Sequence, residues 1–490
     1  MSQPNSQEQT IYRSLAGQIQ LGFYDAGERF PSVQEIAGHF QVSCCPAQRA
    51  LKALERDGLI RLCRGKPTIV LAKPYESFLE SPVFLRRAPA LGDLVESLGL
   101  ISSSVCFEGL CLLADSGLPD PPNEKTGHPG KRLYRLFDQA LQALGSQTAR
   151  SLYYDIGSFA QSAFLDILYA KAGGGEAGAY LNGLSDSLLQ SLTDCRTGRR
   201  PAAKDRLERM ERGFYERLGQ YFSGQAPEAA DQEPFRWEPY KGRTRYCDII
   251  AIDLLRKIDQ GVYPVGSPLP GGAVLADTYH VSPMTIRRTI GLLGKLGITR
   301  TRNGVGTGVV CAVDSSTPYK IKNLMIDHNF RICLEALQLL AITCEPVIPY
   351  TFSHCPPKAL EALEEALQIE APHASMVAVI GACLQAVACH CPLAAIREIY
   401  GKLTLSLLGG SVLQFGESGR EPAADWPDIS SELSGGLKTG DPQRFAAAFR
   451  RMLTDSFHSV QRKLIQIGVA GAQEIRAPLP SSQGPAPRHK

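Results

Sequence analysis

The sequence lacks a long hydrophobic run and a regular cysteine framework, and its net charge is only +3. No stretch of about 18 consecutive apolar residues occurs, and the first ten residues are polar, so we expect neither a membrane span nor a secretion signal. The 14 cysteines are scattered along a long chain, which is typical of reduced thiols in the cytoplasm. These absences predict a cytoplasmic protein without a membrane partner.

Motifs of common catalytic sites are also missing. The sequence has no G-x-S-x-G, no Walker loop, no H-E-x-x-H and no G-x-G-x-x-G in a strand–helix context. With 490 residues, 44% of them hydrophobic, the chain is long enough for about three to four packed domains. We therefore expect a multidomain protein that is not an enzyme and carries no cofactor.

What the sequence does contain is an internal repeat. Sliding residues 22–70 by 239 positions, without gaps, pairs 14 identical residues in 49, against about three expected by chance from average residue usage. The identities include the glycines and prolines that mark turns, such as Gly27, Pro31 and Gly58. The two segments should therefore share a backbone conformation.

The first copy, module 1, has the pattern of three helices and a hairpin. Helices are expected over 11–21, about 32–39 and about 44–57, followed by two short strands around Gly65. Ser32 and Glu35 have capping-box spacing, and Ser43 stands where it would cap the third helix. The spacing of this third helix predicts an inward face of Ala47, Ala50, Leu51 and Leu54 and an outward face of Gln48, Arg49 and Lys52.

Module 2 repeats this plan. Ser282 is a cap residue followed by Pro283 at the first helical position. The spacing predicts an inward face of Ile286, Ile290 and Leu293 and an outward face of Arg287 and Arg288. Arg302, Asn303 and Gly304 turn the second hairpin. A helix, a helix-turn-helix and a hairpin together form a winged helix-turn-helix.

The positive charge is concentrated in these modules. Residues 1–73 carry a net +3 and residues 241–312 a net +6, so the rest of the chain carries a net −6. A basic excess on an outward helix face and a hairpin is typical of phosphate contacts, although a solvated charged face would have the same composition. Because both modules share this placement, we expect DNA binding.

Both modules resemble the winged helix-turn-helix of the GntR family of bacterial transcription regulators. Module 1 has GFYDAGERFPSVQEIA, VSCCPAQRAL and GKPTIV, and module 2 has GVYPVGSPLPGGAVLA, VSPMTIRRTI and GVGTGVV. The family's arginine after V-S is replaced by Cys44 and by Pro283. Module 2 keeps Thr285 and Arg287 where module 1 has Pro46 and Gln48, so we expect module 1 to grip DNA less tightly or to read a different half-site. The resemblance implies DNA-binding roles for Ser43, Gln48, Arg49, Lys52, Arg64 and Lys66 in module 1, and for Ser282, Thr285, Arg287, Arg288, Arg302 and Gly304 in module 2.

Each module is followed by a long segment with helical periodicity, over 75–235 and over 317–470. These segments resemble the helical ligand-binding and dimerisation domain of the FadR-like subgroup. Many members of that subgroup hold a metal with an aspartate and three histidines. Asp138 stands near the aspartate position, but the histidines are not evident, so no metal is expected. A small-molecule effector fits the resemblance, and a packed apolar core is the alternative.

The expected fold is therefore mainly α, with two winged helix-turn-helix modules, each followed by an all-α bundle. The expected domains are module 1 (1–73), helical domain 1 (74–235), module 2 (236–316), helical domain 2 (317–475) and a disordered tail (476–490). Regulators of this type bind near-palindromic operators as homodimers. We therefore expect one chain to act as an intrachain pseudo-dimer on double-stranded operator DNA, with a homodimer that has four modules as a further arrangement. The alternative function is a protein-interaction module whose winged helices have lost DNA binding.

Overall fold

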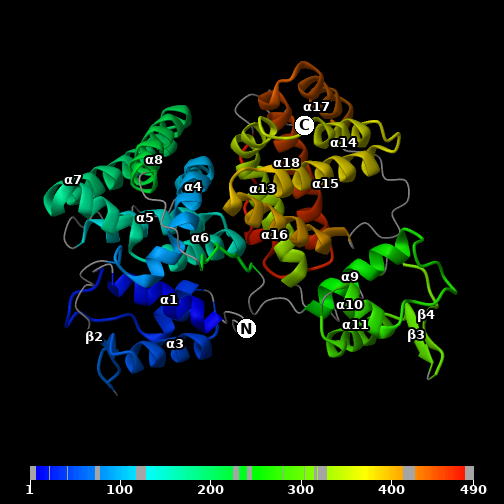
Figure 1. Ribbon diagram of the computed structural model, residues 1–490, viewed down its shortest axis with the longest axis horizontal. Coiled ribbons are helices and arrows are strands. Elements are labelled where there is room, and N and C mark those ends of the chain that lie inside the picture. Colours follow the sequence, from blue (N-terminus) through cyan, green and yellow to red (C-terminus); the bar gives the residue numbers. More distant parts are fainter. Residues whose placement is uncertain are drawn as a thin grey trace. The chain divides into compact units, whose positions relative to one another are not determined.

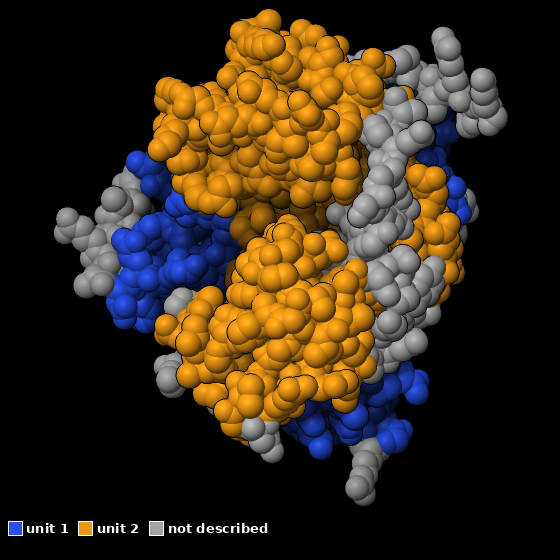
Figure 2. Space-filling model, turned by 90° about the vertical axis from the view of Figure 1, so that its right-hand side faces the viewer, with its two compact units in different colours: residues 1–241, 392–398 blue, residues 242–391, 399–490 orange. Residues whose placement is uncertain are grey.

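A computed structural model describes residues 7–20, 23–40, 42–63, 65–71, 78–116, 128–223, 231–239, 246–279, 281–302, 304–313, 317, 328–411 and 425–480. They form two compact units, shown in different colours in Figure 2: unit 1 with residues 1–241 and 392–398, and unit 2 with residues 242–391 and 399–490. The described chain is mainly helical, with one small antiparallel hairpin in each unit. The expected fold class is confirmed.

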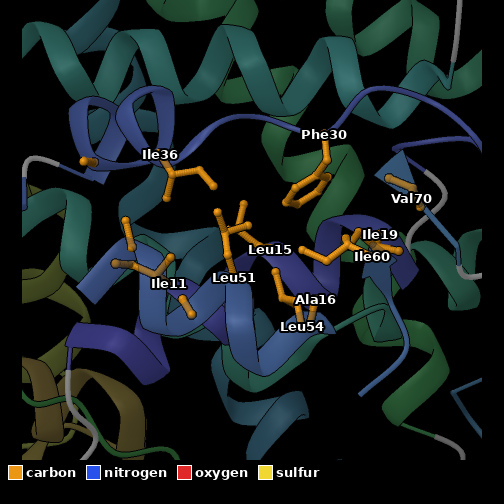
Figure 3. Packing of buried hydrophobic residues seen from close by; sticks show 13 residues of the cluster. Ile11, Leu15, Ala16, Ile19, Phe30, Ile36, Leu51, Leu54, Ile60 and Val70 are labelled. Atoms are coloured by element: carbon orange, nitrogen blue, oxygen red, sulfur yellow. The ribbon is translucent and has the colours of Figure 1, made fainter. Parts of the chain in front are cut away.

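Module 1 consists of α1 (Gln7–Gln20), α2 (Val33–Phe40), α3 (Cys44–Arg56), β1 (Ile60–Arg61) and β2 (Ile69–Val70), coloured blue in Figure 1. Its core gathers Ile11, Leu15 and Ile19 of α1, which recur every four residues and so share one face (Figure 3). The predicted inward face of α3 is confirmed, because Ala47, Ala50, Leu51 and Leu54 are at most 1% exposed.

Capping hydrogen bonds were predicted at the N-termini of α2 and α3, and the structure has the predicted bonds at α2 only. The capping box of α2 is confirmed: the Ser32 amide donates to Glu35 Oε2 over 2.7 Å, and the Glu35 amide donates to Ser32 Oγ over 3.3 Å. Ser43 does occupy the N-cap position of α3, but its hydroxyl makes no capping hydrogen bond. The predicted position of Ser43 is therefore right, but the predicted capping hydrogen bond is wrong. The exposed Ser43 hydroxyl is available to another partner.

Module 2 consists of α9 (Tyr246–Asp259), α10 (Gly272–Thr278), α11 (Pro283–Lys295), β3 (Thr299–Arg302) and β4 (Gly306–Val309), coloured green in Figure 1. Here the predicted cap is confirmed, because the Thr285 amide donates to Ser282 Oγ over 3.2 Å. Ile286 and Leu293 are buried as expected, whereas Ile290 is only partly buried. The buried residue beside it is Thr289, which donates its hydroxyl to the Cys247 carbonyl of α9 over 3.1 Å.

The two modules share their hairpin register and several backbone hydrogen bonds at equivalent positions. The hairpins share one register, since Ile60 pairs with Val70 in the first and Thr299 with Val309 in the second, 239 positions later. The Phe30 amide donates to the Thr68 carbonyl over 2.7 Å, and its counterpart at Leu269 donates to Thr307 over 2.8 Å. Gly58 and Gly297, which follow the third helix of each module, both have a positive φ, near +71° and +77°. The duplication inferred from sequence identity is therefore also a duplication of structure.

Helical domain 1 consists of α4 (Pro82–Asp115), α5 (Pro129–Ala143), α6 (Gln147–Ala160), α7 (Ala163–Arg196) and α8 (Arg200–Phe222). The long helix α4 packs against α5, α7 and α8. The approach of α4 to α5 is close at Gly109, because a Cβ atom added there would collide with the carbonyl oxygen of Ala140. Within α7 the helix bends at Gly173, whose φ is +71°.

Helical domain 2 consists of α13 (His328–Phe352), α14 (Pro357–Leu367), α15 (Pro372–His390), α16 (Ala394–Ser411), α17 (Trp426–Thr439), α18 (Pro442–Gln466) and the 3-10 turn η2 (Ala472–Glu474). α13 packs along α18. The buried side chains of these two helices include Phe330 of α13 and Phe445, Phe449 and Phe457 of α18. The short turns from α7 to α8, at Gly198, and from α17 to α18, at Gly440, each contain a glycine with a positive φ, +76° and +64°.

The chain end differs from the sequence-based expectation. Residues 476–480, expected within a disordered tail, lie against helical domain 2. Gln338 of α13 donates to the Arg476 carbonyl over 2.7 Å, and Arg450 of α18 donates to the Leu479 carbonyl over 3.1 Å. These bonds correct the expected start of the tail, and residues 481–490 lie outside the described residues.

Three described helices are long and apolar enough to cross a membrane by length and composition alone: α4, residues 330–352 of α13, and α15. The expectation of no membrane span was based on the lack of an unbroken apolar run. These three helices contain polar residues between their apolar ones, so they have no unbroken run although their mean hydropathy is high. Their most apolar windows are 61% buried in α4, 83% buried in α13 and 33% buried in α15. Packing inside the helical domains therefore accounts for the apolar character of the first two.

Candidate nucleic-acid interface

The third helix of module 1 presents a polar surface on the side opposite its core. Gln48, Arg49 and Lys52 of α3 are all exposed, as predicted from the helical period. Neither Arg49 nor Lys52 forms an ion pair with any residue that the structure describes. A cation without a carboxylate partner remains available to an external anion such as a phosphate.

The equivalent helix of module 2 carries more positive charge. Arg287 and Arg288 of α11 are both exposed, and Ser282 and Thr285 lie at the start of the same helix. The Ser282 and Thr285 hydroxyls are 2.9 Å apart, so the cap residue and its neighbour form one polar cluster at the helix N-terminus. Amides at such an end favour an approaching phosphate.

Each hairpin adds exposed residues to its module. Lys66 lies in the first hairpin, and Arg302 and Gly304 lie in the second; all three are exposed. Gly304 has a φ of +75°, a conformation that favours glycine at this turn. Arg64 lies outside the described residues, so its predicted role stays a prediction.

Two further exposed arginines lie in the hairpins and were not among the predicted contacts. Arg61 of β1 and Arg300 of β3 are equivalent residues of the two hairpins, and both are exposed. The sequence already indicated both residues. They are identical at the offset of 239, and each carries the positive charge expected of a phosphate contact.

Module 1 is joined to helical domain 1 by a polar network within unit 1. The Tyr154 hydroxyl of α6 donates to Asp138 Oδ1 of α5 over 2.7 Å and lies 3.3 Å from His39 Nε2 at the end of α2. Arg150 of α6 donates to the Tyr154 hydroxyl over 2.8 Å and also to the His39 carbonyl. Asp138, predicted to stand near a metal-ligand position, is thus used to hold Tyr154.

Burial shapes the protonation of this network. Desolvation lowers the pKa of His39, opposed by the negative charge of Asp138 and assisted by the positive charge of Arg150. Burial also raises the pKa of Tyr154 above its usual range, so its hydroxyl keeps its proton. The contact therefore favours a neutral imidazole beside a neutral phenol.

A cavity of about 620 Å³ lies beside this network, between module 1 and α5. Its aromatic wall includes Phe23, Tyr24 and Tyr134, and its charged groups include Lys131 and Arg135. Lys131 Nζ lies 3.2 Å from Glu28 of module 1 and 4.4 Å from the centre of the Tyr24 ring. A molecule in this cavity would contact the module and the helical domain together. Among the described residues, no group of three or more His, Cys, Asp or Glu side chains is placed to hold a metal ion.

Comparison with known proteins finds relatives of the modules. The family model described as "Bacterial regulatory proteins, gntR family" matches residues 7–70 and 248–309. The HTH-type transcriptional regulator TreR of Bacillus subtilis (strain 168) is 34% identical over 85 residues, which are 17% of this chain and 36% of TreR. The Exu regulon transcriptional regulator of Escherichia coli (strain K12) is 41% identical over 61 residues, which are 12% of this chain and 24% of that protein.

The chain thus spans little more than a third of the length of one of these relatives and about a quarter of the other. A solved structure of Streptococcus agalactiae GntR matches with a TM-score of 0.21 and 18% identity, covering 44% of this chain and 99% of that one. This score is too low to support an argument about the fold. The likeness of the helical domains to the FadR-like subgroup stays a prediction. Residues 7–70 and 248–309 are two winged helix-turn-helix domains of the gntR family of bacterial regulatory proteins, duplicated in tandem within one chain.

Proposed function

We propose that the chain is a transcription regulator that binds double-stranded DNA through both modules. The observation that carries this proposal is the repeated pairing of a packed helix-turn-helix with an exposed basic helix face. α3 and α11 have 13 residues each, a size that enters the major groove of B-DNA. The proposed contacts are the predicted residues of both modules, extended by Arg61 and Arg300.

The two modules would read different half-sites. At equivalent positions α3 presents Gln48 and Arg49, whereas α11 presents Arg287 and Arg288. Arginine forms bidentate bonds with guanine and glutamine with adenine, so this difference would change the preferred base. We infer that the operator is an imperfect palindrome read by one chain acting as an intrachain pseudo-dimer. A homodimer with four modules would instead place two chains on each DNA.

A direct experiment identifies the operator and counts the chains. Random-sequence duplexes retained by the purified full chain would be sequenced, and the enriched site would be used in sedimentation with the protein. The proposal expects one enriched site with two unlike halves and one chain per duplex. Two chains per duplex would reject the pseudo-dimer, and no enriched sequence would reject specific DNA binding.

We also propose that a small effector acts through the cavity between module 1 and α5. Its aromatic wall and its size, within the range of about 300–1,000 Å³ common for ligand sites, support this role. A ligand there would alter how module 1 is held against helical domain 1. Retention of operator fragments with and without candidate metabolites tests this, and a Tyr134→Ala variant should lose any metabolite effect while keeping DNA binding.

The proposed function places the protein in the cytoplasm, without enzymatic activity. A second candidate is a protein-interaction module. It is favoured for module 1 alone by Cys44, Pro46 and Gln48, which differ from the equivalent residues of module 2, Pro283, Thr285 and Arg287. The salt dependence of binding separates the two candidates. DNA affinity should fall steeply as salt rises if phosphates are contacted.

A further inference from the structure

Two buried cysteines of helical domain 1 lie in contact. Cys111 is near the end of α4, and Cys195 is in the last turn of α7, 84 positions further along the chain. Their sulfur atoms are 3.3 Å apart, and the residues are 0% and 4% exposed. Both are free thiols in the structure.

We propose that Cys111 and Cys195 are a redox modification site, where a hydroperoxide converts the two thiols into a reversible disulfide. A disulfide has a sulfur separation of about 2.05 Å, so the two atoms need to approach by only about 1.2 Å from their present 3.3 Å. The site is separate from the modules and from the cavity. It is therefore independent of the proposed DNA binding.

The surroundings assign different roles to the two sulfurs. The hydrogen bond between the two thiols lowers the pKa of Cys195, burial opposes this effect, and the positive charge of Arg200 adds to it. Asp115 holds Arg200 there, with both carboxylate oxygens 2.8 Å from its guanidinium. The same hydrogen bond, together with burial, raises the pKa of Cys111. Cys195 is also the more exposed residue, at 4% against 0% for Cys111, so we assign Cys195 as the attacking thiolate and Cys111 as the resolving thiol.

The reaction balances with a hydroperoxide as the only oxidant. The Cys195 thiolate attacks the terminal peroxide oxygen, the O–O bond breaks, and Cys195 becomes a sulfenic acid while hydroxide leaves and takes a proton. Cys111 then loses its proton and attacks the sulfenic sulfur, forming the S–S bond and releasing water. Two thiols and one hydrogen peroxide give one disulfide and two waters, and a dithiol reductant reverses the step.

Cys106 provides a matched comparison. It lies on the same helix α4, is equally buried, and is close enough to Cys195 for their charges to interact. The hydrogen-bonded partner of Cys195 is nevertheless Cys111. Replacing either cysteine of α4 by alanine changes the core by one sulfur atom, so the two variants test which thiol is the partner.

The test treats the full chain with a small molar excess of hydrogen peroxide, blocks the remaining thiols with N-ethylmaleimide and digests the protein with trypsin without reductant. The expected product links peptide 88–125 to peptide 172–196. Apart from one N-ethylmaleimide group on Cys106 in the wild type, its mass should be about 2 Da below the sum of the two free peptides. It should form in the wild type and in Cys106→Ala, be absent in Cys111→Ala and disappear after treatment with dithiothreitol. Circular dichroism would show that each variant is folded.

Two further results bear on the proposal. The oxidised Cys106→Ala protein should unfold at a higher urea concentration than its reduced form, because the cross-link restricts the unfolded chain. The proposal is overturned if the folded wild type forms no linked peptide. It is also overturned if the link persists in Cys111→Ala, because Cys106 would then be the partner.

Discussion

His39 Nε2, at the end of α2 in module 1, lies 3.3 Å from the hydroxyl of Tyr154 in α6 of helical domain 1. The two residues are 115 positions apart in the chain. Their contact joins module 1, which is proposed to bind DNA, to helical domain 1, which is proposed to respond to an effector. Asp138 Oδ2 lies 3.8 Å from Nδ1 of the same imidazole, and Arg150 donates to the His39 backbone carbonyl. The protonation of His39 therefore bears on how module 1 is held.

The contact should weaken in acid. Because the pKa of His39 is below its ordinary value of 6.5 in the folded protein, the unfolded chain takes up the proton first as the pH falls through that value. The stabilisation is present above pH 6.5 and is lost below it. Urea unfolding of unit 1 at several pH values should show a decline toward acid that is smaller in His39→Gln. Equal slopes for both proteins would contradict the role assigned to His39.

Glu211 should give the opposite pH dependence. Burial raises the pKa of this carboxyl to about 8, and its Oε2 atom has no hydrogen-bond partner among the described residues. The unfolded carboxyl loses its proton near the ordinary pKa of 4.5, so the free energy of unfolding falls as the pH rises from 4.5 toward 8. Glu211→Gln should be more stable than the wild type at pH 8, by about 4 kcal/mol, and nearly equal to it at the acid end. Chemical unfolding at both ends of this range measures the difference, and a Glu211→Gln protein less stable at pH 8 would contradict the account.

Gly109 should tolerate no side chain. A Cβ atom there would meet the backbone of Ala140, so Gly109→Ala must push α4 away from α5 and should lower the stability by about 1–3 kcal/mol. Gly157 on α6 is a matched control, because nothing lies within 4 Å of an added Cβ atom. Gly157→Ala should raise the stability by up to about 1 kcal/mol through helix propensity. The melting temperatures of both variants test the close approach of α4 to α5. A Gly109→Ala variant with the wild-type melting temperature would contradict it.

The two modules should contribute unequally to DNA affinity. Arg288 has Arg287 beside it, whereas Arg49 has Gln48, so the arginine of module 2 acts within the stronger basic cluster. Arg288→Ala should weaken binding of the enriched operator about tenfold, and Arg49→Ala by less. Arg212→Ala, an exposed arginine on α8, is the control and should leave binding unchanged. Equal losses in a gel shift for the two module variants would show that the modules grip DNA alike.

The sequence predicted the modules well because their structure is set by local spacing. The inward residues of α3, the capping box of Ser32 and Glu35 and the repeated turns all depend on neighbours a few positions away. The cap at Ser43 failed because the direction of one hydroxyl is not set by residue type. Arg61 and Arg300 could have been included, since their identity and charge were visible.

Contacts between distant segments could not be predicted in this way. Tyr154 and His39 meet only through the docking of α6 against module 1, and Cys111 and Cys195 meet only where α4 crosses α7. Neither pair has a characteristic spacing in the chain. The packing of residues 476–480 against α13 and α18 likewise depends on surfaces formed far earlier in the sequence.

The most direct test of the central claim is the salt dependence of operator binding, followed by fluorescence anisotropy of a labelled duplex. If both modules contact phosphates, the logarithm of the wild-type association constant should fall linearly and steeply with the logarithm of the salt concentration. The slope should be shallower in the double variant Arg49→Ala, Arg288→Ala. A wild-type affinity that does not change with salt, or a double variant with the wild-type slope, would contradict the claim that these two helix faces bind DNA.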